Sequence, residues 1–266
     1  MITNHEIQQF EREGVVAIRQ ILSAQEIESL KTAVVSIEDN PGPLSIPQSR
    51  EERSKGFVED FRRWQDQKPI ETIARNSSLP QVASLLTKSS TIRFHHDHIL
   101  VRSKGNQQRT PWHQDQPYYD LNGTQTVSFW IPLESVPVEE CMEVVAGTHT
   151  GSWMMPRTFV DKEARWFPEG TLQEVPDIDN DRDSFSVRSW ALEPGDAICF
   201  SFLSLHAAPG SRKGRRTVSL RYVGDNVRRA QRSWKTSPPF PELEDPVTGL
   251  QDGEELNHPL FPVVWP

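Results

Sequence analysis

Hydrophobic positions in the first ninety residues recur at helical spacing. Ile7 and Phe10 share one face of a segment that ends at Gly14. Ser23 and Glu26 have the spacing of a capping box, which predicts that a helix begins there and continues through residue 37. The other predictions for this region are a strand over residues 15–21, a helix break at 40–42, an irregular polar segment over 43–66 and a short helix over 79–87.

From about residue 91 the pattern changes to short runs rich in β-branched and aromatic residues. Turn residues such as Gly105, Gly123 and the Pro194–Gly195 pair separate these runs. Helices followed by a block of strands predict an α+β, mainly β fold: a double-stranded β-helix (jelly roll, cupin-like) with supporting N-terminal helices. The predicted strands lie at residues 91–102, 126–136, 142–147, 196–208 and 217–225.

The length of 266 residues fits one large domain, because β-barrels often reach this size undivided. Residues 1–90 are predicted to be a helical support region and residues 91–230 the jelly-roll core. Residues 156–188 form an insert in that core, and residues 231–266 a C-terminal extension. The insert is long and precedes the strand that carries His206, so we hypothesise that it covers the active site as a lid.

Composition narrows the class of partner. A net charge of −8 argues against nucleic acid, and no apolar run approaches the ~20 residues that a membrane span needs. Cys141 and Cys199 are the only cysteines and are too far apart for a thiolate zinc motif. The polar N-terminus is unlike a secretory signal, so we expect a protein of the reducing cytoplasm. The oligomeric state stays open.

A candidate metal site lies in the stretch TPWHQDQPYYD. His113 and Asp115 are two residues apart, and on a strand such residues point to the same face. With His206 from a distant strand they form a two-histidine, one-carboxylate facial triad, which holds Fe(II) and leaves positions open for a co-substrate and O₂. A second H-x-D at residues 95–97 lacks a following strand with a third histidine and then an arginine, so we interpret it as a decoy.

The arginine in question is Arg215, nine residues after His206 in the strand RRTVSLRY. It shares one face with Thr217, Ser219 and Arg221, whereas the face that holds Arg216 is otherwise apolar and predicted to pack against the core. An arginine next to a hydroxyl can receive a carboxylate. The alternative is an ordinary solvent-facing side of the strand.

These motifs resemble those of the phytanoyl-CoA dioxygenase family of Fe(II)/2-oxoglutarate oxygenases. The resemblance covers nearly the whole chain and also includes SFWIPLESV, EVVAGTH, LEPGDAICF and the tail HPLFPVVW. It implies iron ligands at His113, Asp115 and His206, and it places Arg215 on the distal carboxylate of 2-oxoglutarate. The residues that it implies in supporting roles around the co-substrate are Thr217, Trp130, Gln114 and His98, with Arg216 as an alternative to Arg215 that the strand faces disfavour.

The function expected from this resemblance is hydroxylation of an unactivated C–H bond of a small metabolite or natural-product intermediate, with release of succinate and CO₂. The carboxylate at Asp115 argues against halogenation, because halogenating relatives have a small residue there. Alternatives are desaturation, epimerisation or ring formation at the same site, a non-catalytic metabolite-binding protein, and a zinc hydrolase, for which Arg215 would have no purpose. The substrate stays open. Candidate pocket residues are Phe57, Trp64, Tyr118, Tyr119, Phe167 and Arg221.

Overall fold

The computed structural model describes residues 2–47, 56–158 and 170–266. Four α-helices lie in its first third, and the capping boxes explain where two of them begin. Ser23 accepts a hydrogen bond from the backbone of Glu26, whose carboxylate accepts one from the Ser23 backbone, and Thr3 and Glu6 do the same. Gly14 ends the first helix in the left-handed conformation. The helices are α1 (Asn4–Glu13), α2 (Ala24–Asp39), α3 (Lys68–Asn76) and α4 (Leu79–Thr87).

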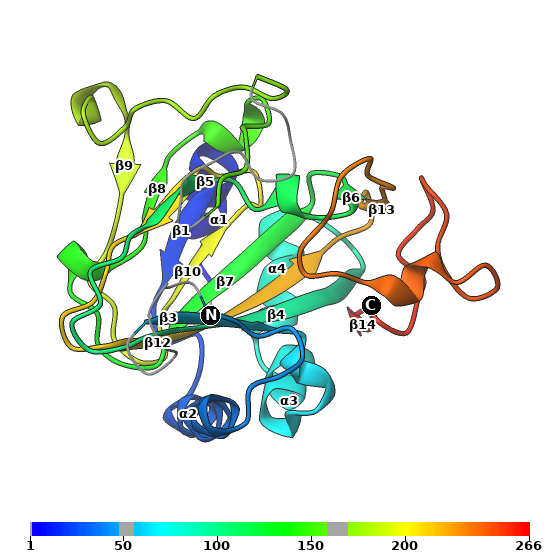
Figure 1. The fold of residues 1–266 in the computed structure, drawn as a ribbon, viewed down its shortest axis with the longest axis horizontal. Helices are drawn as coiled ribbons and strands as arrows, with labels where there is room; N and C mark the ends of the chain where they lie inside the picture. Colours follow the sequence, from blue (N-terminus) through cyan, green and yellow to red (C-terminus); the bar gives the residue numbers. More distant parts are fainter. Residues whose placement is uncertain (1, 48–55, 159–169) are drawn as a thin grey trace.

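A large antiparallel sheet forms the main layer of the fold (Figure 1). Its central strands are β7, β12 and β4, and the N-terminal part of the chain extends both of its edges. In spatial order the strands are β1 (Val15–Ile18), β10 (Ala197–Phe200), β7 (Thr126–Pro132), β12 (Arg215–Val223), β4 (Ile92–Arg102), β3 (Phe57–Phe61) and β2 (Ile46–Pro47), and β14 (Val263–Trp265) also pairs with β4.

A smaller sheet faces the first one and closes the jelly roll, which confirms the predicted fold class. Its strands, in order, are β5 (Thr110–His113), β11 (His206–Ala208), β8 (Glu143–Val145) and β9 (Val187–Arg188). A separate pair, β6 (Leu121–Asn122) and β13 (Arg228–Arg229), lies on the same side of the molecule as the C-terminal segment (Figure 1). None of the helices in the described ranges is long and apolar enough to cross a membrane.

The two faces of β12 divide as predicted. Val218, Leu220 and Tyr222 are buried in one hydrophobic cluster with residues of α2, α3 and α4, which cover the outer face of the large sheet (Figure 1). Arg216, on the same side, forms ion pairs with Glu38 and Glu134. The opposite face of β12 therefore lies in the interior between the two sheets, and the solvent-facing alternative is wrong.

Two local predictions were wrong. Residues 43–66 contain β2 and β3, because Glu59 and Asp60 are buried with polar partners and hide the usual apolar pattern of a strand. Residues 196–208 form two strands in different sheets, β10 and β11, since the chain turns at Ser201–Leu205. The helix α3 was not predicted.

Candidate metal centre

The three predicted metal ligands converge in the structure. His113 ends β5, and His206 begins β11 as its direct partner in the antiparallel ladder. Asp115 Oδ1 lies 3.7 Å from His113 Nε2 and 3.8 Å from His206 Nε2. One donor atom from each residue lies within 4.8 Å of the other two, and this is the one such group among the described residues. All three side chains are buried.

The local geometry differs from the sequence argument in one respect. Asp115 does not lie on a strand: its backbone is helical, and it precedes a 3-10 turn at Gln116–Tyr118. The carboxylate therefore reaches the two imidazoles from a turn rather than from the same strand face as His113. The ligand set is as predicted, but the alternation argument that led to it is wrong for this residue.

Hydrogen bonds fix which atom of each imidazole faces the site. His113 Nδ1 lies 2.8 Å from the Pro111 carbonyl, and His206 Nδ1 lies 2.9 Å from the Ser204 carbonyl. A carbonyl oxygen can only accept, so both Nδ1 atoms carry the proton and both Nε2 atoms offer a lone pair toward Asp115. Two neutral imidazoles and one carboxylate at one point fit Fe(II).

Electrostatics keep all three donors free of competing protons. Burial, reinforced by the neighbouring imidazole, lowers the pKa of His113 to about 3, and burial also lowers the pKa of His206. Burial alone would raise the pKa of Asp115, but its neighbours, chiefly the positive charge of Arg221, outweigh it and lower this pKa to about 2. The site therefore presents one negative charge and two lone pairs at neutral pH.

These buried imidazoles predict that the metal-free protein loses stability in mild acid. In the folded state burial lowers the pKa of His95 and His113 to about 3, whereas in the unfolded chain they take up a proton near 6.5. The unfolded state binds more protons between these values, so acidification below about pH 6.5 lowers the free energy of unfolding by up to about 1.4 kcal/mol per pH unit for each such histidine. Thermal unfolding in a chelator between pH 7.5 and 5 checks this, and a constant midpoint would contradict it.

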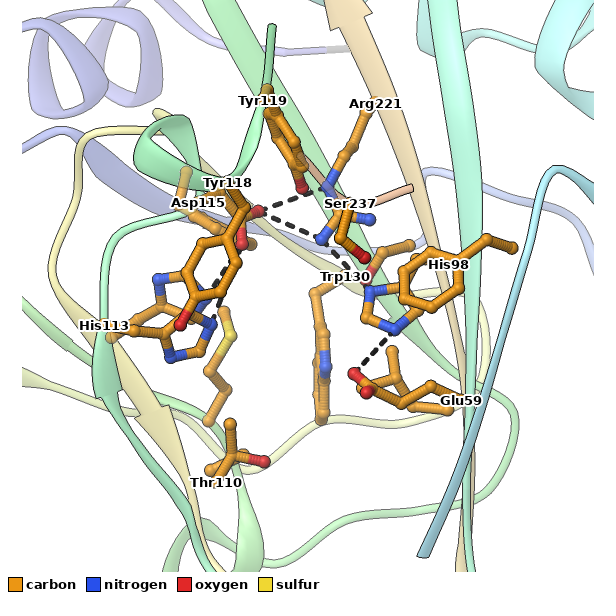
Figure 2. A pocket seen from close by; sticks show the side chains of 17 residues that line it. Glu59, His98, Thr110, His113, Asp115, Tyr118, Tyr119, Trp130, Arg221 and Ser237 are labelled. Atoms are coloured by element: carbon orange, nitrogen blue, oxygen red, sulfur yellow. Dashed lines mark hydrogen bonds and ion pairs between the residues drawn. The ribbon is translucent and has the colours of Figure 1, made fainter. Parts of the chain in front are cut away.

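The cavity beside the ligands lies between the two sheets (Figure 2). Trp130 and His98, which the family resemblance implies in supporting roles, both line it. Of the candidate substrate residues, Tyr118, Tyr119 and Arg221 line it as well. Phe57 instead packs under Arg102, and Trp64 belongs to the core cluster shared with the helices. Phe167 lies outside the described residues.

Arg215 lies next to the cavity rather than in its wall. Its guanidinium carbon is 5.4 Å from the centre of the Trp130 ring, and Nη2 donates to the Pro209 carbonyl at 3.1 Å. Nη1 donates to the carbonyl of Glu140. The Thr217 hydroxyl donates to the Leu100 carbonyl at 3.3 Å. Arg215 is buried, and its hydrogen bonds within the described residues go to carbonyl oxygens rather than to a carboxylate.

Sequence reasoning missed Arg102, at the end of β4. It is the direct partner of Arg215 in the ladder between β12 and β4 and is equally buried. It donates to the Gln108 carbonyl and to the hydroxyl of Thr110, which lines the cavity. Burial and the charge of Arg215 lower the pKa of Arg102 to about 9. No spacing within the sequence indicates this pair, because it depends on the register of two distant strands.

Gln114 is not brought to the cavity. Its amide nitrogen donates to the carbonyls of Leu203 and Ser152, at 2.9 and 3.3 Å, and its amide oxygen accepts from the backbone of Met154 at 2.8 Å. These bonds join the loop after β5 to the turns before β11 and after residue 151. We infer that this side chain supports the position of its neighbours His113 and Asp115.

The second H-x-D does not form a metal site in the structure. Asp97 accepts hydrogen bonds from the backbone of Arg63 and Trp64, at 3.0 and 2.8 Å. The register of β4 against β12 shifts at His95, and the rings of His95 and His96 both pack near Tyr119 and Phe240. Asp97 therefore binds backbone amides, and residues 95–97 do not join a third metal-ligating side chain among the described residues.

Comparison with solved structures finds similar folds at low sequence identity. The α-ketoglutarate-dependent carbocyclase SnoK from nogalamycin biosynthesis aligns with a TM-score of 0.76 and 19% identity over 98% of this chain and 96% of its own. The epimerase SnoN, solved with Fe³⁺, α-ketoglutarate and nogalamycin RO, gives 0.72 and 18% over 98% and 97%. EctD from S. alaskensis, solved with 2-oxoglutarate and 5-hydroxyectoine, gives 0.70 and 17% over 96% and 85%.

No curated protein matches this sequence significantly. The family model described as phytanoyl-CoA dioxygenase matches residues 10–217, a range that includes His113, Asp115, His206 and Arg215. Together with the donor set, this match confirms the predicted iron and 2-oxoglutarate. The chain therefore belongs to the phytanoyl-CoA dioxygenase family.

Proposed function

We propose that this protein hydroxylates an unactivated C–H bond of a small-molecule metabolite or natural-product intermediate. The observation that carries the proposal is the buried group of His113, Asp115 and His206, which opens onto a cavity lined by both aromatic and polar side chains. When bound, iron with 2-oxoglutarate and O₂ supplies an oxidant strong enough for such a bond, and succinate and CO₂ are released.

The protein's own contribution is to hold and orient the reactants. Two neutral imidazoles and one carboxylate would occupy one side of the metal and leave the other side to the reactants. Arg215 and Arg102 form a buried pair of cations beside the cavity, and neither forms an ion pair with a carboxylate of the described residues. A dianionic co-substrate that reaches this pair would add a contacting negative charge, which supports the assignment of its distal carboxylate to Arg215, with Trp130 as the neighbouring wall.

The wall of the cavity formed by β3 and β4 is the proposed substrate region. His98 stacks on Phe61, with ring centroids 4.1 Å apart, and its Nε2 lies 2.9 Å from Glu59 Oε1. Tyr118 lies across the cavity (Figure 2), and its hydroxyl donates to the carbonyl of Arg157 at 2.8 Å. Flat aromatic walls beside the Glu59 carboxylate suit a ring-containing molecule that carries a hydrogen-bond donor.

Ring formation or epimerisation at the same site is a second candidate. It is favoured by the similarity of the fold to SnoK and SnoN, a carbocyclase and an epimerase. The three outcomes share the hydrogen-abstraction step and differ in the fate of the substrate radical. The mass of the product distinguishes them: one added oxygen for hydroxylation, two hydrogens lost for ring closure, and no change for epimerisation.

Anaerobic reconstitution tests the proposal. We expect Fe(II) and 2-oxoglutarate together, but neither alone, to give the weak visible charge-transfer absorption of a chelated co-substrate, and true substrates from a panel to perturb it. His206→Ala is the matched negative control, because it removes one ligand. Absence of the absorption in the wild-type protein would contradict the proposal. A wild-type protein that binds both but consumes no O₂ with any substrate would favour a binding protein.

A further inference from the structure

Asp115 has a second contact that the ligand set does not require. Its Oδ2 accepts hydrogen bonds from Arg221 Nε at 3.1 Å and Arg221 Nη2 at 3.0 Å, while Oδ1 faces the two imidazoles (Figure 2). We propose that Arg221 is a positioning residue that keeps Asp115 a one-oxygen ligand and so keeps coordination positions open for 2-oxoglutarate and O₂. The inference rests on the metal site described above.

The two oxygens of Asp115 are clearly divided between these roles. Two donors of one guanidinium converge on Oδ2, so this oxygen is occupied by charge-assisted hydrogen bonds. Oδ1 remains for the metal. If Oδ2 were released, a carboxylate could bind the metal through both oxygens and take a position that the co-substrate needs.

Arg221 is itself held from several sides. It projects from the interior face of β12, where the register of the adjoining β4 shifts. Its Nη2 lies 3.3 Å from His98 Nδ1, and its guanidinium lies 5.7 Å from the centre of the Tyr119 ring. A guanidinium can only donate, so His98 Nδ1 accepts and His98 carries its proton on Nε2, toward Glu59. Glu59, His98 and Arg221 thus form one supported chain that ends on the metal ligand.

Charge explains why arginine suits this position. Asp115 and Arg221 are 4% and 3% exposed, and Asp115 is the carboxylate with which Arg221 forms an ion pair among the described residues. A buried pair of this kind is costly to break from one side, because the remaining charge stays desolvated. A lysine would keep the charge but offers a point donor instead of the planar fork.

The test uses Co(II), whose visible absorption reports the coordination of the metal. Loss of an outer-shell partner of a metal ligand typically lowers metal affinity or activity by 10- to 100-fold. We therefore expect Arg221→Met to weaken 2-oxoglutarate binding to the Co(II)-loaded protein by about 10- to 100-fold. We also expect it to change the Co(II) spectrum before any 2-oxoglutarate is added. Arg221→Lys should give a smaller change of the same kind.

The matched control is Arg229→Met. Arg229 is as buried as Arg221, and it forms ion pairs with Asp120 and Glu244 rather than with a metal ligand. Its replacement should lower stability while leaving the Co(II) spectrum and 2-oxoglutarate affinity unchanged. Loss of 2-oxoglutarate affinity in this control to the same extent would overturn the positioning role.

A wild-type spectrum and wild-type 2-oxoglutarate affinity in Arg221→Met would also overturn the inference. If Arg221→Met does not fold, His98→Leu carries the test, because it removes the acceptor that holds Arg221 Nη2. It should shift the Co(II) spectrum in the same direction by a smaller amount, and an unchanged spectrum would overturn the inference. Failure of the wild-type protein to bind Co(II) together with 2-oxoglutarate would instead contradict the proposed function.

Discussion

Asp115→Ala is expected to abolish substrate-dependent succinate formation. The substitution removes the negatively charged ligand and leaves two neutral imidazoles, so Fe(II) would have one protein ligand fewer and no compensating charge. It also leaves Arg221 buried without its carboxylate. Loss of an outer-shell partner alone typically costs up to about 100-fold in metal affinity, so loss of the ligand should cost more. Metal affinity by anaerobic titration and succinate by chromatography measure the effect.

The second H-x-D supplies the control for this result. Asp97 is also a buried carboxylate, but it caps the backbone of Arg63 and Trp64. Asp97→Asn should lower stability and leave metal affinity within about twofold of wild type, because Asp97 is no ligand. Full activity in Asp115→Ala would refute the metal assignment, and so would full activity in His206→Ala.

The second large effect is expected for substitution of Arg215, next to the cavity. Arg215→Ala should raise the 2-oxoglutarate concentration needed for half-maximal turnover by about 10- to 100-fold, since a hydrogen bond to a charged group contributes about 1.5–3 kcal/mol. The maximal rate should change less, because Arg215 lies away from the metal ligands. Steady-state kinetics with 2-oxoglutarate as the varied reactant measure both quantities.

Substitutions of the neighbouring Arg216 and Arg102 show whether the effect of Arg215→Ala is specific to Arg215. Arg216→Ala is the control, because Arg216 pairs with Glu38 and Glu134 on the outer face of β12 and should leave the 2-oxoglutarate requirement unchanged. Arg102→Ala should act in the same direction as Arg215→Ala, given their partnership across the ladder. If Arg215→Ala has no effect and Arg102→Ala has a large one, the anchor is Arg102 and the assignment of Arg215 is wrong.

The features of this fold that could be predicted are those set by residues close together in the sequence. The helix start at Ser23 and the helix end at Gly14 follow from hydrogen bonds within four residues. The two faces of β12 follow from alternation alone, which puts Arg215 and Arg216 on opposite faces and predicts that the face of Arg216 packs against the core. The candidate ligand set could also be predicted from the sequence. His206 follows on a later strand, with Arg215 nine residues after it, and this pattern distinguishes His113 and Asp115 from the second H-x-D at residues 95–97.

The rest depends on partners that are distant in the sequence. β3 carries Glu59 and Asp60 in buried positions, and their partners His98 and Arg63 become neighbours only after folding. Arg102 meets Arg215 through strand register, and Arg221 meets Asp115 through a turn that alternation does not foresee. Buried charge is therefore where the sequence pattern is least informative and where the function of this protein is concentrated.

The pairing of His113 with His206 has a consequence beyond catalysis. These residues oppose each other in one short ladder and come from strands far apart in the chain. An ion bound to both would cross-link β5 and β11, and a ligand that binds the folded state alone adds about 2.7 kcal/mol to stability at one hundred times its dissociation constant. Iron supply would then govern the lifetime of the protein as well as its turnover. Without the metal, the ladder between β5 and β11 would open more easily, and the chain would be degraded more easily.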